Sequence, residues 1–145
     1  MNMLIMMQGA SGSSKSTTAK NFKVVLEFAG YIVEIFSTDE FFYINGQYKF
    51  DPTKLSLYHI MNLDRTLKAL EDGKTVIVDN TNLLRSHCKH YVQWAVDHNI
   101  PVYFYRATGN FQNIHGVPDK KVEQMHSIME DLTVESVLAS KAYHS

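Results

Sequence analysis

The segment from Gly9 to Thr17 has residue types and a spacing that could bind a phosphate chain. Small residues let successive backbone N–H groups point into one concavity, and the helix N-terminus that follows adds partial positive charge. In the pattern G-x-x-x-x-G-K-[ST], the lysine neutralises the β- and γ-phosphates and the hydroxyl ligates Mg²⁺. Lys15 and Ser16 stand at these positions, whereas Ser14 replaces the last glycine. The segment therefore predicts a nucleotide-binding loop, with a flexible turn as the alternative interpretation.

The elements on either side of this loop favour phosphate binding. Residues 4–8 form an apolar run, and residues 15–28 place apolar side chains at helical spacing before Gly30. A strand, a loop and a helix in this order form the context in which such a loop binds phosphate. We predict that the nucleotide is contacted by Gly9, Ser11, Gly12, Ser13, Ser14, Lys15, Ser16 and Thr17.

The rest of the chain alternates between predicted strands and helices. Short β-branched, aromatic or apolar runs predict three further strands, which span residues 31–36, 75–78 and 102–105. Apolar residues at helical spacing predict three further helices, which span residues 53–72, 85–99 and 122–132. This alternation predicts a three-layer α/β fold of the P-loop NTPase type, with a parallel sheet of about four strands and helices on both faces.

Polar residues follow the predicted strands at the edge of the sheet where ligands bind in such folds. Asp39 follows the second strand, and Asp79 and Asn80 follow the third. Each has an ordinary alternative, because Asp39 could cap a helix and the other two could be turn residues. The aromatic residues at 41–43 and 48 could stack a nucleobase or close the core over the loop. Convergence beside the phosphate loop favours function for Asp39 and Asp79.

Four sequence blocks together resemble the polynucleotide-kinase-like family of P-loop kinases. This family includes phage-type 5′-hydroxyl polynucleotide kinases and the kinase-like domain of Nedd4-binding protein 2. The blocks span residues 9–17, 37–42, 76–82 and 113–118. The first block is common to P-loop proteins, and the other three are more specific. The resemblance covers most of the chain, from about Met3 to Met129.

The resemblance implies that the γ-phosphoryl group of ATP is transferred to a hydroxyl acceptor, which is a polynucleotide 5′-hydroxyl end, a nucleoside or a nucleotide. It implies that Asp39 is the general base, in agreement with the ability of a nearby carboxylate to take the proton of the acceptor. Lys15 would stabilise charge on the phosphates, and Ser16 and Asp79 would hold Mg²⁺. Asn80 would orient the substrate or brace the loop.

The resemblance also implies a short lid around residues 109–121, in which Gln112 and His115 contact the nucleotide. Three residues depart from the family pattern: Ser14 replaces a glycine, Gln112 replaces an arginine of the lid, and Phe42 replaces an arginine that holds a substrate phosphate in phage-type enzymes. The departures at Ser14 and Gln112 keep open an alternative function, that of a catalytically impaired nucleotide-binding or host-interaction protein on the same scaffold. The departure at Phe42 argues against 5′-hydroxyl ends that carry a 3′-phosphate as substrates.

Composition and charge narrow the class of protein. The 145 residues are 45% hydrophobic and carry a formal net charge of −1, which fits one domain over residues 1–145 and gives no general attraction to nucleic acid or membrane. Cys88 is the only cysteine, which excludes an intrachain disulfide. Without a signal sequence or an apolar run of about 18 residues, we expect a cytoplasmic protein that does not contact a membrane. The sequence leaves the oligomeric state open.

Overall fold

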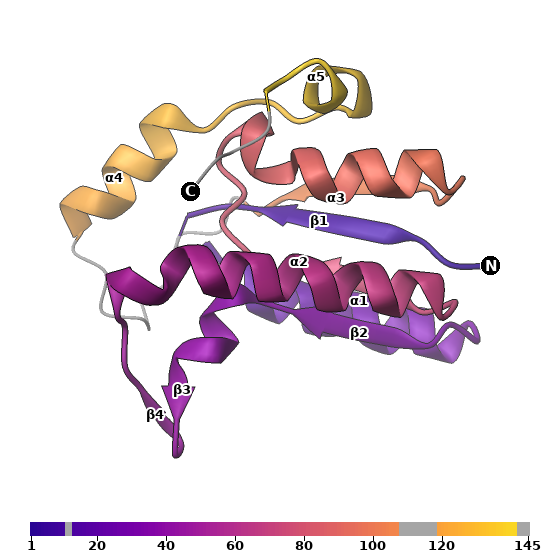
Figure 1. The fold of residues 1–145 in the computed structure, drawn as a ribbon, viewed down its shortest axis with the longest axis horizontal. Helices are drawn as coiled ribbons and strands as arrows, with labels where there is room; N and C mark the ends of the chain where they lie inside the picture. The colour runs from indigo at the N-terminus through magenta and orange to yellow at the C-terminus, as the bar shows by residue number, and fades with distance from the viewer. Residues whose placement is uncertain (11–12, 108–118, 142–145) are drawn as a thin grey trace.

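A four-stranded parallel sheet forms the centre of the fold (Figure 1). Its strands lie in the order β2 (Val33–Phe36), β5 (Thr75–Val78), β1 (Leu4–Gln8) and β6 (Val102–Arg106). The computed structural model describes residues 1–10, 13–107 and 119–141. Within these ranges, no helix is long and apolar enough to cross a membrane.

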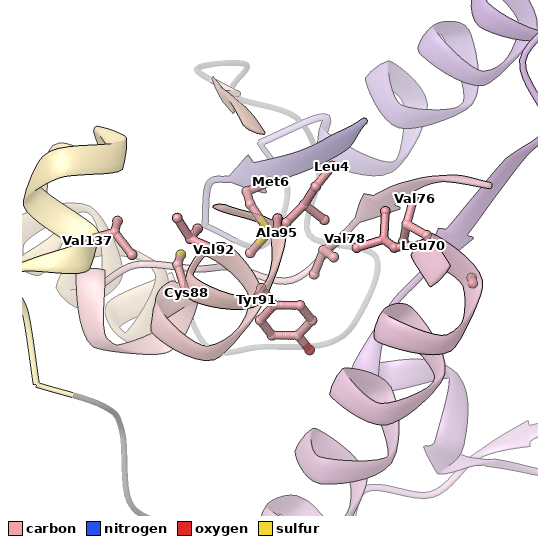
Figure 2. Packing of buried hydrophobic residues seen from close by; sticks show 11 residues of the cluster. Leu4, Met6, Leu70, Val76, Val78, Cys88, Tyr91, Val92, Ala95 and Val137 are labelled. Atoms are coloured by element: carbon pink, nitrogen blue, oxygen red, sulfur yellow. The ribbon is translucent and has the colours of Figure 1, made fainter. Parts of the chain in front are cut away.

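The hydrophobic core forms two clusters, one on each face of the sheet, because successive residues of β1 point to opposite faces. Leu4 and Met6 pack with three helices: α2 (Leu55–Glu71), α3 (Arg85–Asp97) and α5 (Val134–Leu138). Ile5 and Met7 pack on the other face with α1 (Lys15–Phe28). Figure 2 shows the first of these clusters, in which side chains of β1, β5 and α3 meet. The predicted three-layer α/β fold is confirmed.

The connection between α1 and β2 is longer than predicted. Gly30 has a φ of 101°, and the N–H of Tyr31 donates to the carbonyl of Leu26 at 3.0 Å. This is the hydrogen-bond pattern with which many helices end. The strand predicted from residue 31 therefore begins at Val33, because the backbone of Tyr31 is used to close the helix.

The segment after β2 contains structure that we did not predict. It forms the 3₁₀ helix η1 (Thr38–Phe42) and a hairpin of β3 (Tyr43–Ile44) and β4 (Gln47–Tyr48). A turn at Asn45 and Gly46 joins these strands, with φ of 53° and 79°, as a type I′ turn requires. Figure 1 shows the hairpin at the end of the molecule away from the N-terminus.

The aromatic cluster after Asp39 is divided between the core and the surface. The ring of Phe42 is buried and contacts the rings of Tyr48, Phe50 and Tyr58. Tyr43 is exposed in the hairpin. Of the two interpretations of this cluster, closure of the core therefore applies to Phe42.

The predicted last helix, over residues 122–132, is present but ends earlier, and a further helix that we did not predict follows it. Helix α4 (Asp119–Ile128) ends before Glu130, and Thr133 begins α5 by accepting a hydrogen bond from the N–H of Ser136 at 3.1 Å. The N–H of Glu130 donates to the carbonyl of Leu83 at 2.8 Å. The prediction was wrong here because this backbone bonds to other segments and not to its own helix. The remaining predicted helix, over 53–72, appears as η2 (Pro52–Lys54) followed by α2.

Candidate active site

The phosphate loop meets β5 through a bond between Ser16 and Asp79. The hydroxyl Oγ of Ser16, in the first turn of α1, donates to Oδ2 of Asp79 at 2.8 Å. The other carboxylate oxygen, Oδ1, is buried and has no hydrogen-bond partner among the described residues. The sequence predicted both residues as magnesium ligands, and the fold brings them together at the carboxyl ends of β1 and β5.

Lys15 lies beside two carboxylates. Burial lowers the pKa of Lys15, and the nearby charges of Asp79 and Asp39 oppose this shift. Asp39 lies in η1, which follows β2, whereas Asp79 follows β5. Lys15 therefore interacts with carboxylates that come from two different strands of the sheet. The three predicted residues are therefore close enough for their charges to interact.

Gly9 is required by close packing at the start of the loop. A Cβ added at Gly9 would lie 2.4 Å from Oγ of Ser13 and 3.1 Å from the carbonyl oxygen of Ala107. The N–H of Gly9 donates to the carbonyl of Thr81 at 3.0 Å, which fixes the loop against the segment after β5. The hydroxyl of Ser13 is buried and has no partner among the described residues.

Ser14 has a left-handed backbone, a conformation that glycine adopts more readily than serine. Its φ is 72° and its ψ is 15°, and its side chain makes no capping hydrogen bond to α1. Serine is favoured at helix N-termini because its hydroxyl can cap them. Ser14 makes no such capping bond, so this preference does not explain the serine here. Its left-handed backbone instead carries the strain that a Cβ causes in this conformation.

We expect Ser14→Gly to keep or raise ATP affinity, because glycine adopts this backbone without strain. Removal of left-handed strain contributes about 1–2 kcal/mol, and the greater freedom of glycine in the unfolded chain offsets about 0.5–1 kcal/mol of it. The midpoint of urea unfolding and calorimetric titration with MgATP measure both effects. A large loss of ATP affinity would show that the Ser14 hydroxyl binds the nucleotide.

Asp39 is held in place by bonds on both sides of it. Its N–H donates to Oγ of Ser37 at 3.2 Å. The N–H of Thr38 donates to Oδ1 of Asn80 at 2.9 Å, and Oγ1 of Thr38 lies 3.1 Å from Nδ1 of His59. Of the two roles considered for Asn80, the structure shows bracing of the loop.

The carboxylate of Asp39 also accepts a long hydrogen bond from Tyr48. The phenol oxygen of Tyr48 lies 3.4 Å from Oδ1 of Asp39. Burial and the neighbouring carboxylate raise the pKa of Tyr48 to about 12, so its hydroxyl stays protonated at neutral pH. Tyr48 comes from the hairpin that the sequence did not predict, and therefore sequence analysis missed this contact.

Arg65 supports the segment that carries Asp39. Its guanidinium lies 4.3 Å from the ring centroids of both Phe36 and Phe41, and it donates to the carbonyl of Ser37 at 3.0 Å. It also pairs with Glu40 at 3.1 Å. The sequence signal was its rarity, since the chain has only three arginines.

The other two arginines are paired as well. Arg85 lies 3.8 Å from a carboxylate oxygen of Glu130, and Arg106 lies 3.0 Å from one of Asp131. All three arginines are therefore engaged in ion pairs within the chain. Lys15 is left as the residue best placed to neutralise a bound phosphate.

The structure describes only some of the remaining predicted site residues. Thr17 is exposed in α1, one residue beyond Ser16. Ser11, Gly12, Gln112 and His115 lie outside the described residues, as does the predicted lid up to residue 118. The last lid positions, 119–121, begin α4.

The donor set fits Mg²⁺ better than a transition metal. Mg²⁺ prefers oxygen ligands and is commonly bound through one or two carboxylates together with substrate phosphates and water. Ser16 and Asp79 supply a hydroxyl and a carboxylate with an unpartnered buried oxygen. Across the described ranges, no group of three or more His, Cys, Asp or Glu side chains could hold a metal without such help.

A phosphate loop after β1, in a parallel sheet of order β2-β5-β1-β6 with helices on both faces, defines a P-loop kinase-like fold. The chain belongs to the AAA domain family AAA_33, whose model matches residues 4–108. It is also 35% identical over 133 residues to human NEDD4-binding protein 2 (Homo sapiens), in an alignment that covers 85% of this chain. The predicted resemblance to that protein is confirmed. The chain spans only 7% of the length of this relative.

Solved structures share the fold at low sequence identity. A mutant of the APS kinase CysC from Mycobacterium tuberculosis matches with a TM-score of 0.60 and 18% identity, over 96% of this chain and 98% of that chain. Kti12 of Chaetomium thermophilum, solved in complex with ADP-AlF3, matches with a TM-score of 0.59 and 18% identity, over 83% of this chain and 64% of that chain. These likenesses establish the kinase-like fold.

Proposed function

We propose that this chain is an ATP-dependent phosphotransferase that moves the γ-phosphoryl group to a hydroxyl acceptor. The acceptor classes considered are a polynucleotide 5′-hydroxyl end, a nucleoside and a nucleotide. The proposal depends mainly on one observation: Lys15 lies close enough to Asp79 and Asp39 for their charges to interact. These three residues follow three different strands of the sheet. Family membership and the kinase-like fold support it, and so does the similarity in fold to Kti12, which was solved in complex with ADP-AlF3.

In the proposed reaction, Asp39 accepts the proton of the acceptor hydroxyl. The acceptor O–H bond breaks as a new O–P bond forms to the γ-phosphorus, and the bond from that phosphorus to the β-γ bridging oxygen breaks to release ADP. The proton moves to a carboxylate oxygen of Asp39. The Tyr48 hydroxyl bonds to Oδ1 and so holds the carboxylate in one orientation.

Lys15 would supply positive charge to the β- and γ-phosphates. Lys15 is the first residue of α1, where the free backbone N–H groups of the helix N-terminus would also favour the bound phosphates. Ser16 and Asp79 would hold Mg²⁺, which would supply positive charge that stabilises the phosphates during transfer. In this arrangement Asp79 acts on the donor nucleotide and Asp39 acts on the acceptor.

Two measurements test the proposal against the alternative of an impaired nucleotide-binding or host-interaction protein. Calorimetric titration with MgATP should show saturable binding, which a scaffold without nucleotide would lack. Incubation with γ-labelled ATP and a panel of nucleosides, nucleotides and 5′-hydroxyl oligonucleotides should label at least one acceptor. Binding without any labelling would favour the nucleotide-binding protein.

We expect Asp79→Asn to weaken the Mg²⁺ dependence of ATP binding. The substitution removes one negative charge and leaves an amide, which is a poorer magnesium ligand. ATP affinity at saturating Mg²⁺ should fall, while affinity without metal should stay within a few-fold of wild type. Titration with ATP over a series of Mg²⁺ concentrations measures this. Equal Mg²⁺ dependence in variant and wild type would remove Asp79 from the metal site.

A further inference from the structure

A cavity of about 520 Å³ lies between α2 and α3, beside the segment that carries Asp39. One wall is a face of α2 with Leu55, His59 and Leu63, and the opposite wall is the first half of α3. The segment 80–82, after β5, closes one end. This volume lies within the range of small-molecule sites.

The cavity is connected to the proposed catalytic base through Thr38. His59 and Asn80 both line the cavity, and both bond to Thr38, the residue before Asp39. Asp39 also raises the pKa of His59, which burial lowers more strongly. The lining of the cavity is therefore coupled to Asp39 through the hydrogen bonds of Thr38 and through the charge that acts on His59.

The lining carries no permanent charge. Among the eleven described residues that line the cavity, none is Lys, Arg, Asp or Glu. Three are histidines: His59 and His87 face each other closely enough for their charges to interact, and His90 lies one turn from His87 on α3. Burial lowers the pKa of His59 and of His87, so both imidazoles are mainly uncharged at neutral pH.

The lining is also amphipathic. Leu55, Ile60 and Leu63 give it apolar surface on α2, while Thr81 and Ser86 add hydroxyl groups. Tyr91 contributes its ring, and Figure 2 shows its hydroxyl pointing away from the apolar cluster. That hydroxyl accepts from Nδ2 of Asn62 at 3.1 Å. Such a surface suits a flat ring with an apolar face and hydroxyl groups.

We propose that this cavity selects an uncharged acceptor, a free nucleoside, over nucleotides and oligonucleotide ends. The proposal rests on the proposed phosphotransferase function for the identity of the ligand as acceptor. A phosphate group inside the cavity would lose water without gaining a permanent cation, which is costly for a charged group. The nucleoside ring instead fits the apolar wall, and its hydroxyls meet the imidazoles and hydroxyl groups.

The test compares uncharged nucleosides with acceptors that carry one or more phosphates. Adenosine, guanosine, cytidine and uridine are assayed with γ-labelled ATP beside their 3′-monophosphates and 5′-hydroxyl oligonucleotides. We expect kcat/KM for the best nucleoside to exceed that of its 3′-monophosphate by at least about tenfold, because the monophosphate brings an unpaired charge. A preference for the monophosphate or the oligonucleotide would overturn the proposal.

A charge variant tests the cause of the selectivity. His90→Arg places a permanent cation in the lining and should raise kcat/KM for the 3′-monophosphate about tenfold relative to the nucleoside. Leu57→Arg is the matched control, because Leu57 is 49% exposed on α2 and does not line the cavity. An equal change in both variants would show that the effect is general electrostatic attraction and would contradict the proposal.

Direct binding separates this inference from the proposed function. Nucleoside is titrated into the protein with a non-hydrolysable ATP analogue while the histidine imidazole signals are followed by NMR. We expect shifts at His59 and His87, and smaller shifts in Ile60→Trp, which places a larger side chain at a lining position that is 59% exposed. If the nucleoside binds but no acceptor is phosphorylated, the proposed phosphotransferase function is contradicted, and the cavity remains a nucleoside-binding site. Unchanged transfer in Ile60→Trp would contradict the proposal that the cavity binds the acceptor, while the proposed phosphotransferase function would still stand.

Discussion

Asp39→Asn is expected to abolish most phosphoryl transfer while MgATP binds within a few-fold of wild type. Loss of a general base typically costs about 10²- to 10⁴-fold in rate. Asparagine is nearly the same size, and its amide oxygen can still accept the hydrogen bond from Tyr48. Single-turnover transfer measures the rate, and calorimetric titration measures the affinity.

The control for this variant is Asp72→Asn, at the far end of α2, which removes the same charge outside the site. It should transfer phosphate like wild type. If ATP affinity falls together with transfer in Asp39→Asn, the carboxylate is a metal or nucleotide ligand, and the base lies elsewhere. If transfer by Asp39→Asn matches wild type, the residue has no catalytic role.

Lys15→Ala is expected to lose measurable ATP-dependent transfer and to keep the fold. The variant removes the cation nearest to the phosphates, and ion pairs already engage all three arginines. Electrostatic stabilisation of a developing charge commonly contributes about 10²- to 10³-fold to a rate. Transfer assays measure the loss, and far-UV circular dichroism checks the fold.

Stability should not fall in this variant. Burial lowers the pKa of Lys15, which means that the folded protein disfavours its charged form. Replacing it with alanine relieves this penalty, so the unfolding midpoint should be equal or higher. Lys20→Ala, an exposed position on α1, is the matched control and should retain transfer. Wild-type transfer by Lys15→Ala would falsify the assignment of the phosphate loop.

The order of strands and helices could be predicted because each element has a short, uniform hydrophobic pattern. The run at 75–78 is buried throughout, as its continuous apolar sequence indicated. The positions of Lys15, Asp39 and Asp79 could be predicted because parallel strands direct the residues that follow them to one edge. The hydrophobic pattern does not predict the break between α4 and α5 near Glu130, because a hydrogen bond to the distant Leu83 sets this boundary.

The cavity between α2 and α3, which we propose for the acceptor, could not be predicted for a different reason. His59, His87 and Tyr91 are spread over two helices, and each has an ordinary place in an amphipathic pattern. Only the packing of α2 against α3 brings them to one cavity. The contact of Tyr48 with Asp39 likewise depends on a two-strand hairpin, which is too short for its pattern to be read.

The buried amide of Gln8 ties the start of the phosphate loop to the end of the chain. Its Nε2 donates to the carbonyls of Asn82 and Glu130 at 3.2 and 2.6 Å, and its Oε1 accepts from Arg106 at 2.8 Å. If the segment at Glu130 detached, this amide would lose a partner, at a cost of about 1–3 kcal/mol. The start of the loop and the segment at Glu130 therefore share one buried amide, and we expect ATP binding to slow hydrogen exchange in both segments together.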